Sequence, residues 1–103
     1  MKYGLKSIHI SKINKVFSEY SQIQKVVLYG SRAKGNFKNG SDIDLTMYGE
    51  NLELGLLFKI ENKLDDLLLA YTIDLSIFNN IDNKSLIEHI NRVGICFYTK
   101  KRE

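Results

Sequence analysis

The stretch LYGSRAKGNFKNGSDIDL, residues 28–45, places ten residues between Gly30-Ser31 and Asp42-Ile43-Asp44. A glycine that follows a strand lets the backbone turn sharply and lets a ligand approach closely. Aspartates at alternate strand positions share one face about 7 Å apart, where they repel each other unless a cation compensates them. Because Mg²⁺ binds carboxylates together with substrate phosphates, the stretch predicts a phosphate-binding turn beside a metal site at Asp42 and Asp44.

Both halves of this stretch also have a purely structural interpretation. Gly30-Ser31 taken alone is an ordinary turn. Asp42 could begin a strand as a turn residue while Asp44 faces water. The metal-site interpretation therefore needs a further ligand from elsewhere in the chain.

Asp74 is the candidate for that ligand. It lies in TIDLSIF, residues 72–78, an otherwise apolar strand in which an ionised carboxylate is costly without a partner. If this strand neighbours the Asp42–Asp44 strand, three carboxylates meet. The alternative is an edge strand whose polar face, with Thr72 and Ser76 in phase with Asp74, meets water.

Length and composition predict one small domain over residues 1–103, with 44% hydrophobic and 26% charged residues. The net charge of +3 is too small for a nucleic-acid-binding stripe, so no direct DNA binding is expected. Arg32, Lys34 and Lys38 instead favour a polyphosphate near the turn. No membrane-spanning window, no secretory signal and a single cysteine, Cys96, predict a cytoplasmic protein without a disulfide.

Hydrophobic periodicity predicts the element order α-β-(turn)-β-α-β-α-β. Helices are expected over about 8–20, 56–68 and 83–93, and strands over about 25–29, 42–48, 71–78 and 95–98. This order predicts an α/β or α+β domain, with a mixed central sheet of about four strands and helices packed against it. The middle helix presents an apolar stripe of Leu56, Leu57, Ile60, Leu64, Leu67 and Leu68. Cys96 is expected in the core, and both histidines, His9 and His89, at the surface.

The string GSRAKG…SDIDL, followed by a later strand aspartate, resembles the signature of the DNA polymerase β-like nucleotidyltransferase superfamily. It is most similar to the minimal nucleotidyltransferase (MNT) branch, and the likeness covers nearly the whole chain. The resemblance implies a nucleotidyltransferase fold in which Gly30 and Ser31 hold the nucleotide phosphates, with Arg32 and Lys34 beside them. It further implies that Asp42, Asp44 and Asp74 ligate two Mg²⁺ ions, and that Asp74 helps to deprotonate the attacking hydroxyl.

The reaction implied by this resemblance moves AMP from ATP to a hydroxyl and releases pyrophosphate. Minimal nucleotidyltransferases of this kind are commonly antitoxins paired with a HEPN-domain ribonuclease toxin, which they neutralise by AMP transfer to a tyrosine, and an oligomer with that partner is conceivable. The chain departs from the pattern in two ways. Lys34 stands where relatives often carry arginine, and no second domain for the acceptor is expected within residues 1–103.

Two other functions stay open from the sequence. The same fold could neutralise a partner by binding alone, without catalysis. Alternatively, the acceptor could be a small molecule, as in aminoglycoside nucleotidyltransferases, although this chain would then need an acceptor-binding wall gained by oligomerisation.

Overall fold

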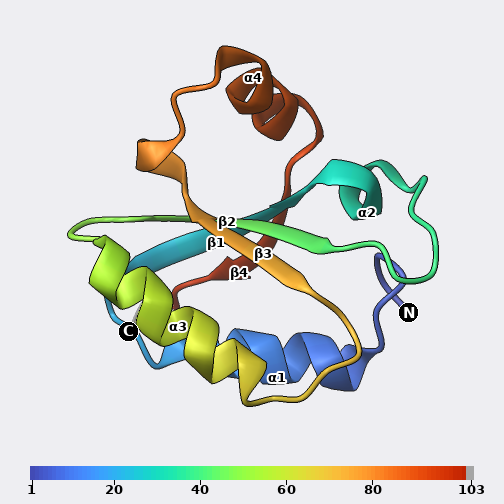
Figure 1. Cartoon of the computed structure of the whole chain (residues 1–103), viewed down its shortest axis with the longest axis horizontal. Helices are drawn as coiled ribbons and strands as arrows, with labels where there is room; N and C mark the ends of the chain where they lie inside the picture. The colour runs from blue at the N-terminus through green and yellow to red at the C-terminus, as the bar shows by residue number, and fades with distance from the viewer. Residues whose placement is uncertain (102–103) are drawn as a thin grey trace.

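A four-stranded sheet forms the centre of the computed structural model, which describes residues 1–101 (Figure 1). The strands are β1 (Ile23–Tyr29), β2 (Ile43–Gly49), β3 (Ile73–Ile77) and β4 (Ile95–Thr99), in the order β3-β2-β1-β4. β1 is antiparallel to both of its neighbours, whereas β2 and β3 are parallel. The predicted mixed sheet is therefore confirmed.

Helices lie on both faces of this sheet (Figure 1). α1 (Ser7–Ser18) and α3 (Leu54–Asp65) cover one face, and α4 (Lys84–Val93) stands over the other. The short helix α2 (Gly30–Lys34) follows β1 directly, and a 3-10 turn, η1 (Phe78–Asn80), follows β3. Parallel strands need a crossover connection, and α3 supplies it between β2 and β3. The predicted element order is confirmed, with helix and strand ends shifted by a few residues.

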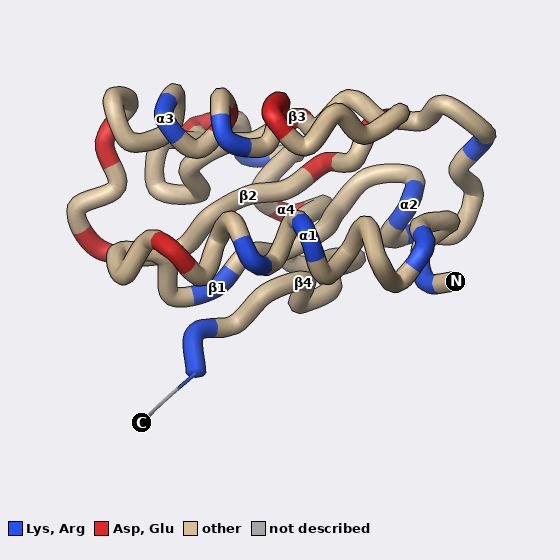
Figure 2. The backbone as a smooth tube through the Cα atoms, turned by 90° about the horizontal axis from the view of Figure 1, so that it is seen from below, with Lys and Arg blue, Asp and Glu red and all other residues tan. Residues whose placement is uncertain are grey.

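The face under α1 and α3, the α1/α3 face, carries the main hydrophobic core. Strand side chains alternate between faces, so every second residue of β2 and β3 enters this core, as in β1 after a register shift near its start. α1 and α3 run alongside each other over it, as seen from below in Figure 2. The buried strand residues of the cluster are Ile23, Val26, Leu28, Ile43, Leu45, Met47, Leu75, Ile77 and Phe97.

The opposite face, the α4 face, is more polar and has a smaller apolar cluster. Val27, Tyr29 and Ile90 form the buried part of that cluster. Thr46 is fully buried beside them and accepts a hydrogen bond from the Ser76 hydroxyl, with 2.9 Å between the two oxygens. Partly buried hydrophobic residues complete this smaller cluster: Tyr48, Phe78, Ile81, Leu86 and Val93.

Two predicted core positions prove wrong. Leu68 is 89% exposed, because α3 ends at Asp65 and Leu68 then adopts a left-handed backbone with φ of 54°. Cys96 is exposed because it lies on the edge strand β4 on the side opposite to the buried Phe97, where no helix covers it. In both cases an apolar stretch extends beyond the part that packs.

No helix within the described residues 1–101 is long and apolar enough to cross a membrane.

Candidate active site

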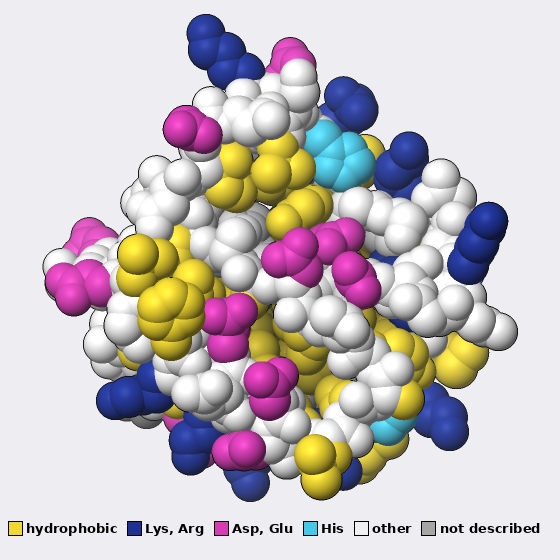
Figure 3. All heavy atoms as spheres, viewed as in Figure 1, with side chains coloured by type: hydrophobic (Ala, Val, Ile, Leu, Met, Phe, Trp, Pro, Cys, Tyr) yellow, Lys and Arg dark blue, Asp and Glu magenta, His cyan; other side chains and the backbone are white. Residues whose placement is uncertain are grey.

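Two carboxylates stand side by side on the α4 face because β2 and β3 are neighbours. Asp44 and Asp74 are register partners in the parallel ladder. Asp42 lies one residue before β2, is exposed, and is joined to β3 through the adjacent Ile43 N–H, which donates to the Thr72 carbonyl at 2.9 Å. The structure thus places the two strands as the three-carboxylate interpretation requires. Figure 3 shows acidic side chains gathered at the centre of this view, where β2 and β3 run in Figure 1.

Asp44 is the carboxylate whose ionisation this arrangement disfavours. Its pKa rises from 3.8 to about 6, because the carboxyl is partly buried and because Asp74 and Asp42 place negative charge near it. Arg32 acts in the opposite direction, with a smaller effect on the pKa. Because ionisation of Asp44 is unfavourable in this surrounding, a bound cation would stabilise the ionised carboxylates.

The donor set suits Mg²⁺, which takes hard oxygen ligands and completes its coordination with water and substrate phosphates. Among residues 1–101, however, no group of three or more His, Cys, Asp or Glu side chains is already arranged around a metal position. Asp42, Asp44 and Asp74 therefore offer compatible ligands rather than a closed cage. Their role as metal ligands stays a prediction.

Gly30 brings the predicted phosphate-binding turn against this carboxylate pair. Its φ of +75° lies in the left-handed region, which disfavours other residues. A Cβ at this position would also collide with the Asp44 carboxylate oxygen Oδ2. The residue is thus fixed as glycine by its backbone angle and by the close approach of Asp44.

His89 is a part of this site that sequence reasoning missed. The Gly30 N–H donates to His89 Nε2 at 3.0 Å, and the imidazole lies edge-on to Tyr29 with 6.2 Å between the ring centroids. His89 is partly buried, as is His9, so the prediction that both histidines lie at the surface is wrong. The sequence spacing could have indicated this inward orientation, because His89 falls within the inward-facing stripe of α4 formed by Leu86, Ile90 and Val93.

Tyr29, the last residue of β1, is also close to the carboxylates. It is the register partner of Asp44 across the β1–β2 ladder, and it is buried. Burial raises the pKa of its hydroxyl, the Ser76 hydroxyl lowers it, and the charges of Asp74 and Asp44 raise it further. Tyr29 therefore stays a neutral phenol beside the acidic pair.

Arg32 is engaged in contacts within the protein. Its side chain is buried, and Nε and Nη2 both donate to the Ser41 carbonyl at 3.1 and 2.9 Å, while Nη1 donates to the Tyr3 carbonyl at 2.9 Å. The guanidinium also lies over the rings of Phe37 and Tyr71, 5.2 and 5.1 Å from their centroids. Through these contacts Arg32 fastens the loop that leads into Asp42. Its predicted phosphate contact stays a prediction.

Ser31 and Lys34 remain near the turn in α2. Ser31 is partly buried, and its carbonyl accepts from the Gly35 N–H at 2.9 Å, which ends the helix in a left-handed glycine. Lys34 is exposed in the last turn of α2. Both side chains therefore stay available as predicted phosphate ligands.

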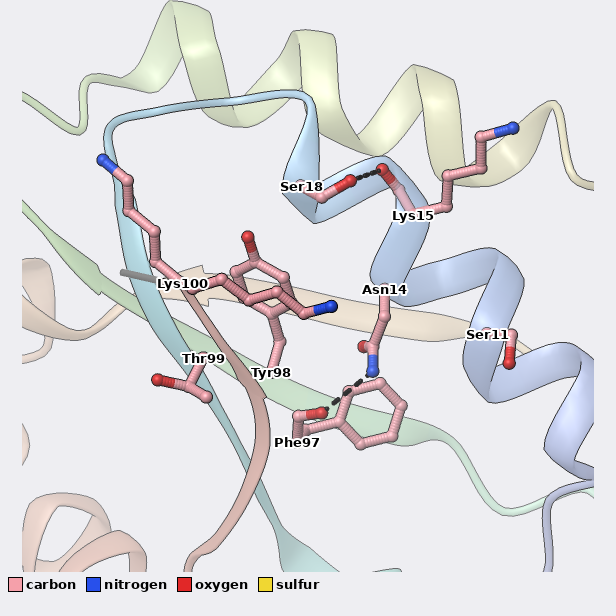
Figure 4. Close-up of a pocket in the computed structure, with 9 residues that line it drawn as sticks. Ser11, Asn14, Lys15, Ser18, Phe97, Tyr98, Thr99 and Lys100 are labelled. Carbon is pink, nitrogen blue, oxygen red and sulfur yellow. Dashed lines mark hydrogen bonds between the residues drawn. The ribbon is translucent and has the colours of Figure 1, made fainter. Parts of the chain in front are cut away.

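A separate hollow of about 750 Å³ lies between α1 and β4 (Figure 4). It is bordered by side chains of α1 and by the chain from Phe97 onward, and the Asn14 amide donates to the Phe97 carbonyl across it at 3.1 Å. Its charged lining residues are lysines: Lys15, Lys100 and Lys101. None of its lining residues within the described part of the chain, 1–101, is a carboxylate, so these residues offer no ligands for the predicted metal chemistry.

Comparison with known proteins gives a family match over most of the chain. The family described as "Polymerase beta, Nucleotidyltransferase" matches residues 11–103. A proposed protein adenylyltransferase of Methanocaldococcus jannaschii is 35% identical over 75 residues, which covers 72% of this chain and 76% of that protein.

Solved structures show the same fold at low sequence identity. A chain of a toxin–antitoxin structure with AMP-PNP aligns with a TM-score of 0.72 and 21% identity, covering 89% of this chain and 74% of the other. A chain from a complex of tri-AMPylated Shewanella oneidensis HEPN toxin with MNT antitoxin aligns with a TM-score of 0.68 and 18% identity, covering 93% and 74%.

Proposed function

The chain belongs to the Polymerase beta nucleotidyltransferase family, and from this premise we propose that it transfers AMP from ATP to a protein hydroxyl. The acceptor is a tyrosine of a HEPN-domain toxin, which the chain thereby neutralises as an antitoxin. The single observation that carries the proposal is the adjacency of Asp44 and Asp74 on parallel strands, directly beneath the Gly30 turn.

In this proposal the residues divide into two groups. Asp42, Asp44 and Asp74 would hold two Mg²⁺ ions, which would supply positive charge to the phosphates and to the attacking and departing oxygens. Ser31 and Lys34 bind the phosphates that leave as pyrophosphate. Because Asp44 has a raised pKa of about 6, it is largely ionised at neutral pH and can serve as a ligand.

The reaction itself needs positioning more than covalent chemistry. The acceptor oxygen forms a bond to the α-phosphorus of ATP, the bond from that phosphorus to the bridging oxygen breaks, and pyrophosphate departs. The acceptor proton passes to the Asp74 carboxylate. Asp74 is more exposed than Asp44.

The partner follows from the relatives and from the face on which the carboxylates lie. One structural neighbour is a complex of an AMPylated HEPN toxin with its MNT antitoxin. In this chain Asp74 is exposed and lies on the edge strand β3. A hydroxyl carried by another protein can therefore approach it from outside the sheet.

The test is AMP transfer from ATP labelled at the α-phosphate, with Mg²⁺ and the HEPN-domain protein that the chain binds. We expect label on a tyrosine of that protein, and none when Mg²⁺ is replaced by a chelator. Binding of the two proteins without any transfer of label would contradict the proposal.

The Asp42→Asn/Asp44→Asn variant distinguishes catalysis from neutralisation by binding alone. Under the proposal this variant still binds the HEPN-domain protein but no longer suppresses its ribonuclease activity. Full suppression by the variant would show that occupancy suffices. Label transferred to an aminoglycoside, with none on protein, would favour a small-molecule acceptor.

A further inference from the structure

A hydrogen bond joins α4 to the turn that begins α2. The donor is the Gly30 N–H and the acceptor is His89 Nε2, 3.0 Å away and 59 residues later in the chain. A ring nitrogen accepts a hydrogen bond only when it carries no proton, so this bond requires the imidazole form with its proton on Nδ1. This is a specific chemical requirement on one side chain.

The imidazole is held in place on two sides. Along α4, His89 is flanked by Leu86, Ile90 and Val93, which pack into the small apolar cluster of the α4 face. Across from it, the ring of Tyr29 lies at an interplanar angle of 81°. Because Tyr29 directly precedes Gly30, the ring and the turn are fixed as one unit.

The turn itself has little freedom on its other side. Gly30 already lies close to the Asp44 carboxylate, so its backbone cannot move further toward Asp44. The bond to His89 ties the Gly30 N–H to α4. Together Asp44 and His89 define the position of the Gly30 peptide.

We propose that His89 is a positioning residue for the phosphate-binding turn. It accepts a hydrogen bond from the Gly30 N–H and holds the turn against Asp44, and it leaves Ser31 free to bind the phosphate. The inference rests on the proposed function, since that function assigns the turn to ATP. It also changes one sequence-based expectation. The Gly30 N–H is already used within the protein, so Gly30 contributes its shape rather than its amide to phosphate binding.

Two substitutions separate positioning from packing. His89→Gln keeps an acceptor oxygen near the place of Nε2, whereas His89→Leu keeps the bulk and removes the acceptor. Ile90→Val is the matched control, because it trims the adjacent core residue of α4 and leaves the hydrogen bond intact. The readouts are the Gly30 amide signal and its hydrogen exchange by NMR, the Kd for magnesium AMP-PNP, and the KM and kcat of AMP transfer.

We expect His89→Leu to shift the Gly30 amide signal, speed its exchange, and raise the Kd for AMP-PNP and the KM for ATP by about 2- to 12-fold, the range of one lost hydrogen bond. The kcat should change less than the KM, because the carboxylates are untouched. His89→Gln and Ile90→Val should stay close to the wild type. An unchanged Gly30 amide in His89→Leu, or equal defects in His89→Leu and His89→Gln, would overturn the inference.

Failure of the proposed function gives a different result. A wild type that transfers no AMP to a bound HEPN-domain protein contradicts that function alone. The Gly30 amide and the Kd for AMP-PNP then still decide the role of His89.

Discussion

The two faces of the sheet are built from alternate residues of the same strands, yet they have opposite character. On the α1/α3 face, residues such as Leu28, Leu45 and Leu75 are buried in a core that includes two helices. On the α4 face, their neighbours Tyr29, Asp44 and Asp74 place a phenol and two carboxylates side by side. The comparison teaches that one face supplies the stability that lets the other tolerate repelling charges.

The largest expected effect is on catalysis by the α4 face. Asp44→Asn removes a proposed metal ligand, whose charge should be worth several kcal/mol in the transition state, so AMP transfer should fall by about three orders of magnitude. The thermal midpoint of the metal-free protein should stay the same or rise, because repulsion among the carboxylates is relieved. Rate measurements check the loss of AMP transfer, and calorimetry on the same sample checks the thermal midpoint. Unfolding of Asp44→Asn would show that this carboxylate is structural.

Leu64→Ala should show the reverse behaviour on the α1/α3 face. Leu64 is 4% exposed in the main core, and deleting its buried atoms should cost about 2–5 kcal/mol of unfolding free energy. For a domain of this size, that lowers the thermal midpoint by at least about 8 °C. The folded fraction should retain AMP transfer. An unchanged midpoint would mean that the orientation of α3 is wrong.

Gly30→Ala tests the close approach of the turn to Asp44. The added Cβ meets both a left-handed backbone and the Asp44 carboxylate, so we expect a loss of about 1–3 kcal/mol in unfolding free energy. Gly40→Ala is the control, because Gly40 has a φ of +85° but no atom within 4 Å of the added Cβ. Chemical denaturation should show a larger loss for Gly30→Ala. Equal losses would remove Asp44 from the explanation.

The smallest expected effect is the pH dependence of stability. The folded pKa of Asp44, about 6, exceeds its ordinary value of 3.8, so in this range the folded state binds more protons than the unfolded state. Acidification therefore stabilises the metal-free protein, and this contribution is lost as the pH rises toward 6. The thermal midpoint of Asp44→Asn, relative to the wild type, should increase from about pH 4 to about pH 7. A constant difference would contradict the raised pKa.

The sequence predicted the elements better than it predicted side-chain environments. The strand and helix order followed from periodicity, and the adjacency of Asp44 and Asp74 followed once β2 and β3 were neighbours. Arg32 could not be placed, because its partners, the carbonyls of Ser41 and Tyr3, are backbone groups that leave no pattern in the sequence.

His89 shows a second limit of sequence reasoning. Its partner is the Gly30 amide, which every residue except proline possesses, so the pairing has no compositional signature. Only its position within the apolar stripe of α4 indicated an inward orientation. The predictions that Leu68 and Cys96 are buried were wrong for a related reason. Apolar character does not reveal where a helix ends or where a sheet edge is left uncovered.

The most direct test of the central claim locates the metal and the nucleotide together. Mn²⁺ added with AMP-PNP broadens NMR signals near its binding site. We predict that the broadening centres on the amides of Gly30, Ser31, Asp44 and Asp74 and spares α1 and β4. Broadening centred elsewhere, such as the hollow lined by Lys15 and Lys100, or unchanged in Asp44→Asn, would contradict the account.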